Sequence, residues 1–169
     1  MPEWASTLIV IACVLAAFLL MWTGWRRRGR RDAGLVPSHA VPAQLDAPVV
    51  AANVLHAATT RHQQPLERVL AAGLSFRANG SLAVHREGVV LRLDGAEDIW
   101  IDRSAVVGAR PAQVAIDKAV ERDGLLALAW NLGPTTLDSY FRVLEPEKSV
   151  ELYDAIDSLT PATPAESEV

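Results

Sequence analysis

An uncharged apolar run near the start of the chain constrains its fold most strongly. Residues 5–25 read ASTLIVIACVLAAFLLMWTGW, and these 21 residues contain no Asp, Glu, Lys or Arg. A helix of this length extends about 31 Å, which matches the hydrocarbon thickness of a lipid bilayer. The run therefore predicts one transmembrane helix over residues 5–25.

Residues that prefer the membrane–water interface flank this run on both sides. Tryptophan, whose indole ring concentrates at the interface, stands at Trp4, Trp22 and Trp25. Five arginines follow the run directly, and they are Arg26, Arg27, Arg28, Arg30 and Arg31. We predict that these eight residues set the interface and the topology of the helix, and the arginines can also bind anionic lipid.

The order of the charges predicts how the helix is oriented. Glu3 is the one charged side chain before the run, and the five arginines come after it. A cleaved signal peptide carries its basic residues before a shorter apolar run, so a signal anchor fits better. Basic residues beside a membrane span remain in the cytoplasm. With one span, we therefore expect a single-pass plasma-membrane protein. Residues 1–4 would form a short tail outside the cell, and the rest of the chain would be cytoplasmic.

Charge is unevenly distributed along the 169 residues, whose net charge is −4. Residues 1–31 carry five arginines and one glutamate, whereas residues 32–169 carry 11 basic and 19 acidic side chains. Nucleic-acid affinity depends on the neutralisation of phosphates, so an acidic body is a poor partner for it. We therefore expect no nucleic-acid binding.

Proline and glycine divide the rest of the chain into segments. Residues 26–47 combine the arginines with Gly34, Pro37 and Pro42, which predicts a basic juxtamembrane segment followed by a linker. Residues 160–169 read TPATPAESEV, which predicts a disordered tail. The region 48–159 between them is long enough for one small core.

A hydrophobic period of two, typical of β-strands, dominates the region 48–159. Residues 82–86 and 89–93 are predicted strands, joined by a tight turn at Glu87-Gly88. Further strands are predicted over residues 99–101, 105–110, 113–118, 125–132 and 137–144. Upstream, residues 49–58 and 66–77 fit strands, although their alanine-rich runs also fit a helix. We expect about seven short strands in antiparallel pairs.

The period changes near the end of this region. Pro146 and the glutamates beside it favour a helix start, and apolar residues then recur every three positions from Val150 to Leu159. The sequence thus predicts a mainly β domain, built as a curled antiparallel sheet or barrel that a C-terminal α-helix caps. One N-terminal transmembrane helix precedes this domain.

Three consecutive features carry a resemblance to a known family: the strand 125–132, the segment TLDSYFR at 136–142 and the helix from Pro146. They resemble bacterial PH-like domains, in particular those of actinobacterial membrane proteins. With the N-terminal helix, the chain is similar to small single-pass proteins, some of which are labelled as transporter or export proteins. The resemblance covers residues 46–159 and 5–31, implies a PH-like barrel and brings no agreed catalytic residues.

A PH-like fold raises the question of phosphoinositide binding, which needs several basic residues around the loop between the first two strands. Residues 59–68 offer Arg61 and Arg68, which Glu67 offsets. Residues 46–157 as a whole carry 11 basic and 16 acidic side chains. The electrostatic requirement is unmet, so we do not expect specific phosphoinositide binding.

Recognisable catalytic and cofactor motifs are absent from the sequence. It contains no phosphate-binding glycine loop, no G-x-S-x-G and no H-E-x-x-H. The single cysteine, Cys13, lies inside the apolar run. The spacing of the four histidines does not match that of metal ligands; they are His39, His56, His62 and His85. We expect no enzymatic activity, no catalytic residue, no metal and no cofactor.

These observations favour a membrane-anchored PH-like module that binds another protein at the cytoplasmic face and serves as a scaffold. The alternative is an accessory subunit of a membrane transport or export system. An enzyme with a dispersed active site is a third possibility. Replacing the helix distinguishes the first two roles, because a simple anchor is exchangeable and a helix that contacts other helices is not.

Overall fold

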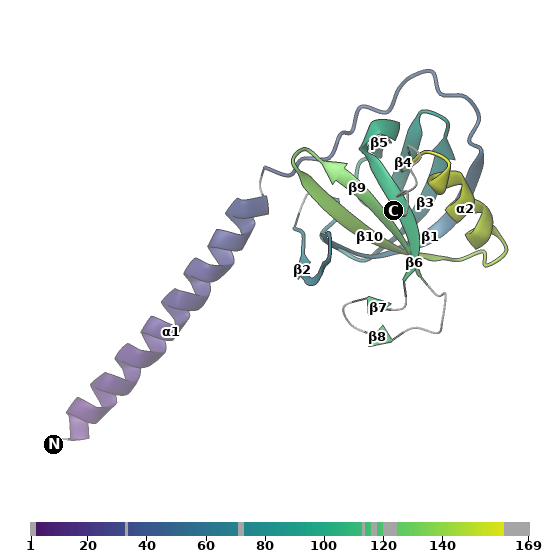
Figure 1. Ribbon diagram of the computed structural model, residues 1–169. Coiled ribbons are helices and arrows are strands. Elements are labelled where there is room, and N and C mark those ends of the chain that lie inside the picture. Colours follow the sequence, from purple (N-terminus) through teal and green to yellow (C-terminus); the bar gives the residue numbers. More distant parts are fainter. Residues whose placement is uncertain are drawn as a thin grey trace, which may run out of the picture. The chain divides into compact units, whose positions relative to one another are not determined.

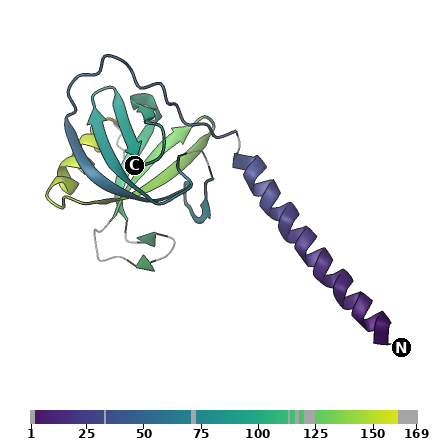
Figure 2. The ribbon, with the colours of Figure 1, turned by 180° about the vertical axis from the view of Figure 1, so that it is seen from behind.

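The structure is a computed structural model that describes residues 3–32, 34–70, 73–112, 114–115, 118–119 and 125–160. It divides into two units, residues 1–34 and residues 35–169, and each is described by itself. Figure 1 shows a helical first unit and a second unit built around a curled sheet, and Figure 2 shows both from behind.

The first unit is the helix α1 (Glu3–Asp32). Its segment Thr7–Arg27 is long and apolar enough to cross a membrane, and none of that segment is buried. The expected N-terminal apolar helix is therefore present. It continues through the arginine cluster to Asp32, because arginine is a good helix former and the helix contains no proline.

The second unit contains one eight-stranded antiparallel sheet in the order β5–β4–β3–β1–β10–β9–β6, with β2 paired to β1. Its strands are β1 (Val50–Arg61), β2 (Gln64–Arg68), β3 (Ala78–His85), β4 (Gly88–Leu93), β5 (Ile99–Asp102), β6 (Val106–Ala112), β9 (Leu125–Leu132) and β10 (Thr135–Val143). The 3₁₀-helix η1 (Arg103–Ala105) precedes β6, and β7 (Val114–Ala115) pairs with β8 (Lys118–Ala119). The predicted mainly β fold is confirmed.

The long strand β1 joins the two halves of the curled sheet. Its first part pairs with β3 over Val50–His56, and its second part pairs with β10 up to Arg61. The pairing with β10 shifts register between His56 and Ala58, which marks a β-bulge. Bulges bend a strand and increase its twist, so β1 turns the sheet around one core.

The core lies inside this sheet, and the helix α2 (Lys148–Asp157) covers it. Leu152 and Ile156 of α2 are fully buried against the sheet. Of the predicted three-residue stripe, Ile156 and Leu159 are buried, whereas Val150 is 67% exposed. The largest strand residues in the core, Trp130 and Phe141, are also buried. The expected capping helix is therefore confirmed.

Two local expectations differ from the structure. The predicted strand 66–77 is the shorter β2, which ends at Arg68. The turn expected at Glu87-Gly88 is Arg86-Glu87, because Gly88 pairs with His85 and begins β4. A Cβ at Gly88 would lie 2.3 Å from the Ile101 carbonyl oxygen, so the close approach of β5 requires glycine there.

Part of the segment expected to be a linker packs on the sheet. Leu35 is buried in the core, and Ser38 forms a β-bridge with Trp100 of β5. Val41 and Leu45 pack against a small cluster on the outer face of the sheet. An open strand edge and an exposed apolar cluster both favour such a cover. In sequence, only two residues separate Asp32 of α1 from Leu35.

Two further predicted segments lie wholly or partly outside the described residues. Of the strand expected over residues 113–118, residues 114–115 and 118 are described and belong to β7 and β8. Of the expected tail 160–169, only Thr160 is described.

Candidate functional site

The predicted membrane residues lie near the two ends of the candidate span Thr7–Arg27 or directly after it. Trp4, Trp22 and Trp25 are 67%, 59% and 69% exposed, and the ring centroids of Trp22 and Trp25 lie 6.3 Å apart. Arg26 and Arg27 are exposed as well. The other three arginines are Arg28, Arg30 and Arg31. Their backbone belongs to α1, and the structure does not describe their side chains.

Within the described residues, no group of three or more His, Cys, Asp or Glu side chains is arranged to hold a metal ion. Two of the histidines hold loops in place by contacts to backbone oxygens. The Nδ1 atom of His39 lies 3.0 Å from the Asp98 carbonyl oxygen, and that of His85 lies 2.8 Å from the Asp46 carbonyl oxygen. The other two histidines belong to the polar networks described next.

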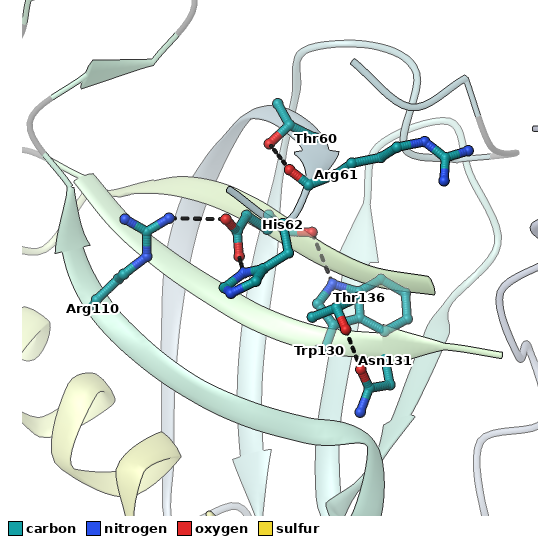
Figure 3. A network of polar contacts seen from close by, with 9 residues as sticks. Thr60, Arg61, His62, Arg110, Trp130, Asn131 and Thr136 are labelled. Atoms are coloured by element: carbon teal, nitrogen blue, oxygen red, sulfur yellow. Dashed lines mark hydrogen bonds and ion pairs between the residues drawn. The ribbon is translucent and has the colours of Figure 1, made fainter. Parts of the chain in front are cut away.

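A buried carboxylate organises the outer face of β10. The side chain of Asp138 is only 1% exposed. Its Oδ1 lies 2.8 Å from His62 Nδ1, and its Oδ2 accepts a hydrogen bond of 2.9 Å from Arg110 Nη2 (Figure 3). An ionised carboxylate only accepts hydrogen bonds, so His62 Nδ1 carries the proton. Asp138 thereby connects the β1–β2 turn to β6.

Strand register places a row of side chains beside this carboxylate. Arg110 of β6 lies opposite Ala127 of β9, which lies opposite Tyr140 of β10. Successive side chains of a strand alternate between faces, so Asp138, Tyr140 and Arg142 share the outer face of β10. Arg110 and Arg142 are exposed, whereas Tyr140 and Ala127 are buried.

Three adjoining hollows follow this outer face. The first, about 740 Å³, is lined by the β1–β2 turn, the end of β6 and Tyr140. The second, about 450 Å³, shares Pro111 with the first and extends to Tyr153 of α2. The third, about 540 Å³, shares Leu125 and Val150 with the second and includes Arg142. We call the three together the outer groove.

The outer groove changes character along its length. At the end near β2 its lining includes His62, Gln63 and Arg110. At the end near α2 the lining is mostly apolar and includes Leu144 and Val150, which are 50% and 67% exposed. The groove thus offers cationic groups beside an apolar surface.

The backbone of Gln63, in the β1–β2 turn that lines the polar end, has a φ of 59°. This left-handed conformation is uncommon for a residue other than glycine.

A second polar network runs through the inside of the barrel. Trp130 Nε1 donates a hydrogen bond of 3.0 Å to Ser139 Oγ, as Figure 3 shows, and the hydroxyls of Ser139 and Thr59 lie 2.9 Å apart. The Nε2 atom of His56 lies 3.0 Å from Thr59 Oγ1, and its Nδ1 lies 3.0 Å from the Phe76 carbonyl oxygen. Every polar side chain of this network therefore has a partner.

The network favours the neutral form of His56. Because the Phe76 carbonyl only accepts, Nδ1 carries the proton and Nε2 accepts from the Thr59 hydroxyl. Burial lowers the pKa of His56, the hydrogen bond to Phe76 opposes this, and the nearby Arg68 lowers the pKa further. This network fixes the core and lies apart from the outer groove.

Sequence reasoning did not identify the outer groove. Its cationic residues, Arg110 and Arg142, lie 32 positions apart in the sequence. Asp138 stands in an alternating strand, where an outward carboxylate is ordinarily a solvated surface group. The outward-facing apolar residues of β9, which begin with Leu125 in the groove, were the available signal, because a half-exposed strand usually presents polar side chains there.

A comparison with protein-family models agrees with the fold. A protein-family model described as "Bacterial PH domain-like" matches residues 35–157. A search of curated proteins found no significant match. Among solved structures, the chain is similar to the C-terminal domain of an unknown protein from Leishmania infantum, with a TM-score of 0.44 and 11% identity over 82% of this chain and 96% of that chain. It is also similar to a chain of "The 8S snRNP Assembly Intermediate", with a TM-score of 0.48 and 12% identity over 76% of this chain and 95% of that chain.

Proposed function

The chain belongs to the bacterial PH domain-like family, and from this premise we propose that it is a membrane-anchored interaction module. In this proposal α1 crosses the plasma membrane once and holds the PH-like domain at the cytoplasmic face. The domain binds another protein there, serves as a scaffold and catalyses no reaction.

The observation that carries this proposal is the direct connection of an apolar helix to a folded domain. The candidate span ends at Arg27, α1 ends at Asp32, and Leu35 is already buried in the domain core. Five further helical residues add about 7.5 Å. A domain tethered this closely remains near the bilayer surface, where it is concentrated together with other membrane-associated proteins.

The arginines after the span support the cytoplasmic orientation. Five of them lie within six positions of Trp25, and Glu3 is the one charged side chain before the span. Such an excess keeps its end of a helix in the cytoplasm. The outer groove supports a binding role, because cationic side chains lie there beside exposed Leu144 and Val150.

A second candidate function is that of an accessory subunit in a membrane transport or export system. It is favoured by the surface of α1, whose apolar side chains from Leu8 to Met21 are exposed. Within a bilayer such a surface is available to lipid or to other helices. This alternative predicts that the identity of the helix matters, whereas a plain anchor is exchangeable.

Crosslinking in intact membranes tests both candidates. Full-length protein is compared with a variant whose residues 5–25 are replaced by an unrelated single-pass helix with the same arginines after it. We expect both proteins to recover the same partner. A partner that is lost after helix replacement favours the accessory-subunit role, and the absence of any reproducible partner contradicts the interaction role.

A further inference from the structure

We propose that the outer groove binds an acidic, partly apolar peptide segment of a partner protein, whose carboxylates pair with Arg110 and Arg142. This inference rests on the proposed interaction function and names its site and the chemistry of its partner. Its basis is the floor of the groove, the fixed position of Arg110 and the charge around the rim.

Apolar residues form the floor of the groove. Pro111 and Ala112 line it beside Arg110, and Leu125 continues it toward α2. Ala112 and Leu125 are 6% and 5% exposed and belong to a cluster apart from the main core. A segment that enters the groove therefore meets an apolar surface next to Arg110.

The buried carboxylate holds Arg110 in position for a ligand. Asp138 uses one oxygen for His62 and the other for Arg110 Nη2, and at 1% exposure it is shielded from any ligand. The guanidinium has five N–H donors in a fixed plane, and the Arg110 side chain is still 51% exposed. Its remaining donors are therefore available to a carboxylate, with little conformational entropy left to lose.

Arg142 supplies a second cationic group at the apolar end of the groove. It lies two residues after Tyr140 on the same face of β10 and is exposed. It lines the same hollow as Leu144 and Val150. A segment that alternates acidic and apolar residues would place carboxylates on the arginines and apolar side chains on the floor and on these two residues.

The surrounding charges favour a peptide over a membrane or a nucleic acid. Glu147, the N-cap of α2, and Glu151 in its first turn are exposed near Val150 at the apolar end. A broad anionic surface that contacts the arginines would also contact these carboxylates, which repel it. A narrow peptide segment can lie in the groove without contacting them. Residues 46–157 carry 11 basic and 16 acidic side chains, which disfavours an extended polyanion.

Fluorescence anisotropy on the full-length protein in neutral detergent micelles tests this site. The probe is a labelled 12-residue peptide in which glutamate alternates with leucine, and its matched control has glutamine in place of glutamate. Arg142→Glu reverses one charge in the groove at an exposed position. Arg86→Glu makes the same change in the exposed β3–β4 turn and is the control variant.

We expect the glutamate peptide to bind and Arg142→Glu to weaken its binding roughly tenfold or more, while Arg86→Glu changes it less than about twofold. The glutamine peptide should bind at least about tenfold more weakly than the glutamate peptide. If Arg142→Glu and Arg86→Glu weaken binding equally, the overall charge of the protein explains the attraction, and the proposed site is overturned. Equal binding of the two peptides would overturn the acidic partner.

Two further results separate the site from the general function. The same protein is also tested with phosphatidylglycerol nanodiscs. If the protein binds these nanodiscs as tightly as the peptide, and if Arg142→Glu abolishes that binding, the groove binds a lipid surface and the peptide assignment is contradicted. A crosslinked partner that Arg142→Glu retains would overturn the groove as its docking site and leave the interaction function standing. If crosslinking recovers no partner and the peptide does not bind, both proposals fail.

Discussion

At the scale of single residues, two polar groups of this small domain are buried for different reasons. Asp138 uses both carboxylate oxygens to hold the β1–β2 turn and β6 against the sheet. His56 is buried in a neutral hydrogen-bonded chain inside the barrel. Because both groups are buried, a substitution that changes only their charge or hydrogen bonding, and hardly their shape, should lower the stability of the domain.

Asp138→Asn removes the charge of the buried carboxylate with little change in volume. We expect the free energy of unfolding to fall by about 1–3 kcal/mol, because one acceptor oxygen becomes a donor that faces His62 or Arg110. Urea denaturation of the full-length protein in micelles measures this loss. Asp157→Asn, at an exposed position of α2, is the control and should change stability by less than about 0.5 kcal/mol. Equal losses would contradict the anchoring role of Asp138.

The lowered pKa of His56 predicts a pH-dependent stability. The unfolded chain takes up a proton at His56 as the pH falls through about 6.5, whereas the folded chain does so only at lower pH. The contribution of His56 is therefore fully present above pH 6.5 and is lost as the pH falls below that value. Urea denaturation between pH 7.5 and 5.5 should show this decrease, and His56→Gln should flatten it. An unchanged slope in the variant would contradict the assignment.

At the scale of elements, α2 stabilises the domain through one buried face. Leu152, Ala155 and Ile156 are buried, whereas Val150 is 67% exposed at the outer groove. The helix has no side-chain hydrogen bond at its N-cap, Glu147. Packing against the sheet is thus the main source of its stability.

Two apolar substitutions in α2 should separate packing from groove lining. Ile156→Ala deletes fully buried methyl groups, and we expect a loss of about 2–4 kcal/mol. Val150→Ala removes exposed methyl groups and should cost less than about 1 kcal/mol. Thermal denaturation followed by circular dichroism checks both values. A loss at Val150 as large as that at Ile156 would show that α2 packs differently.

At the scale of the whole molecule, the central feature is a membrane-length helix that continues almost directly into a PH-like domain. The domain boundary lies between Gly34 and Leu35, earlier than the boundary at residue 48 that composition suggested. Segment 35–45 covers the edge of β5 and part of the outer face, so it belongs to the folded unit. The tether is correspondingly short.

Reporter fusions test the predicted orientation of the full chain. A green fluorescent protein at the C-terminus should be fluorescent, and alkaline phosphatase at the same place should be inactive, because arginines that follow a membrane span favour the cytoplasmic side. Changing the five arginines to glutamate should weaken or invert this preference. Active phosphatase on the unaltered chain would contradict the cytoplasmic placement of the domain.

Sequence alone determined the apolar helix, the mainly β character of residues 48–159 and the capping helix. Each of these rests on a periodicity or a run of neighbouring residues, which local sequence records directly. The same reasoning misplaced the β3–β4 turn by one residue, because the need for glycine at Gly88 comes from Ile101 of another strand.

Tertiary structure alone decided the outer groove and the cover over β5. Strand register brings Arg110 of β6 and Tyr140 of β10, which both line the groove, together across β9. Register depends on pairings between distant segments. The segment 35–45 has a composition typical of a linker, yet it packs because an open strand edge and an apolar cluster lie within its reach. Neither arrangement leaves a local periodic signal, since both depend on contacts across the sheet.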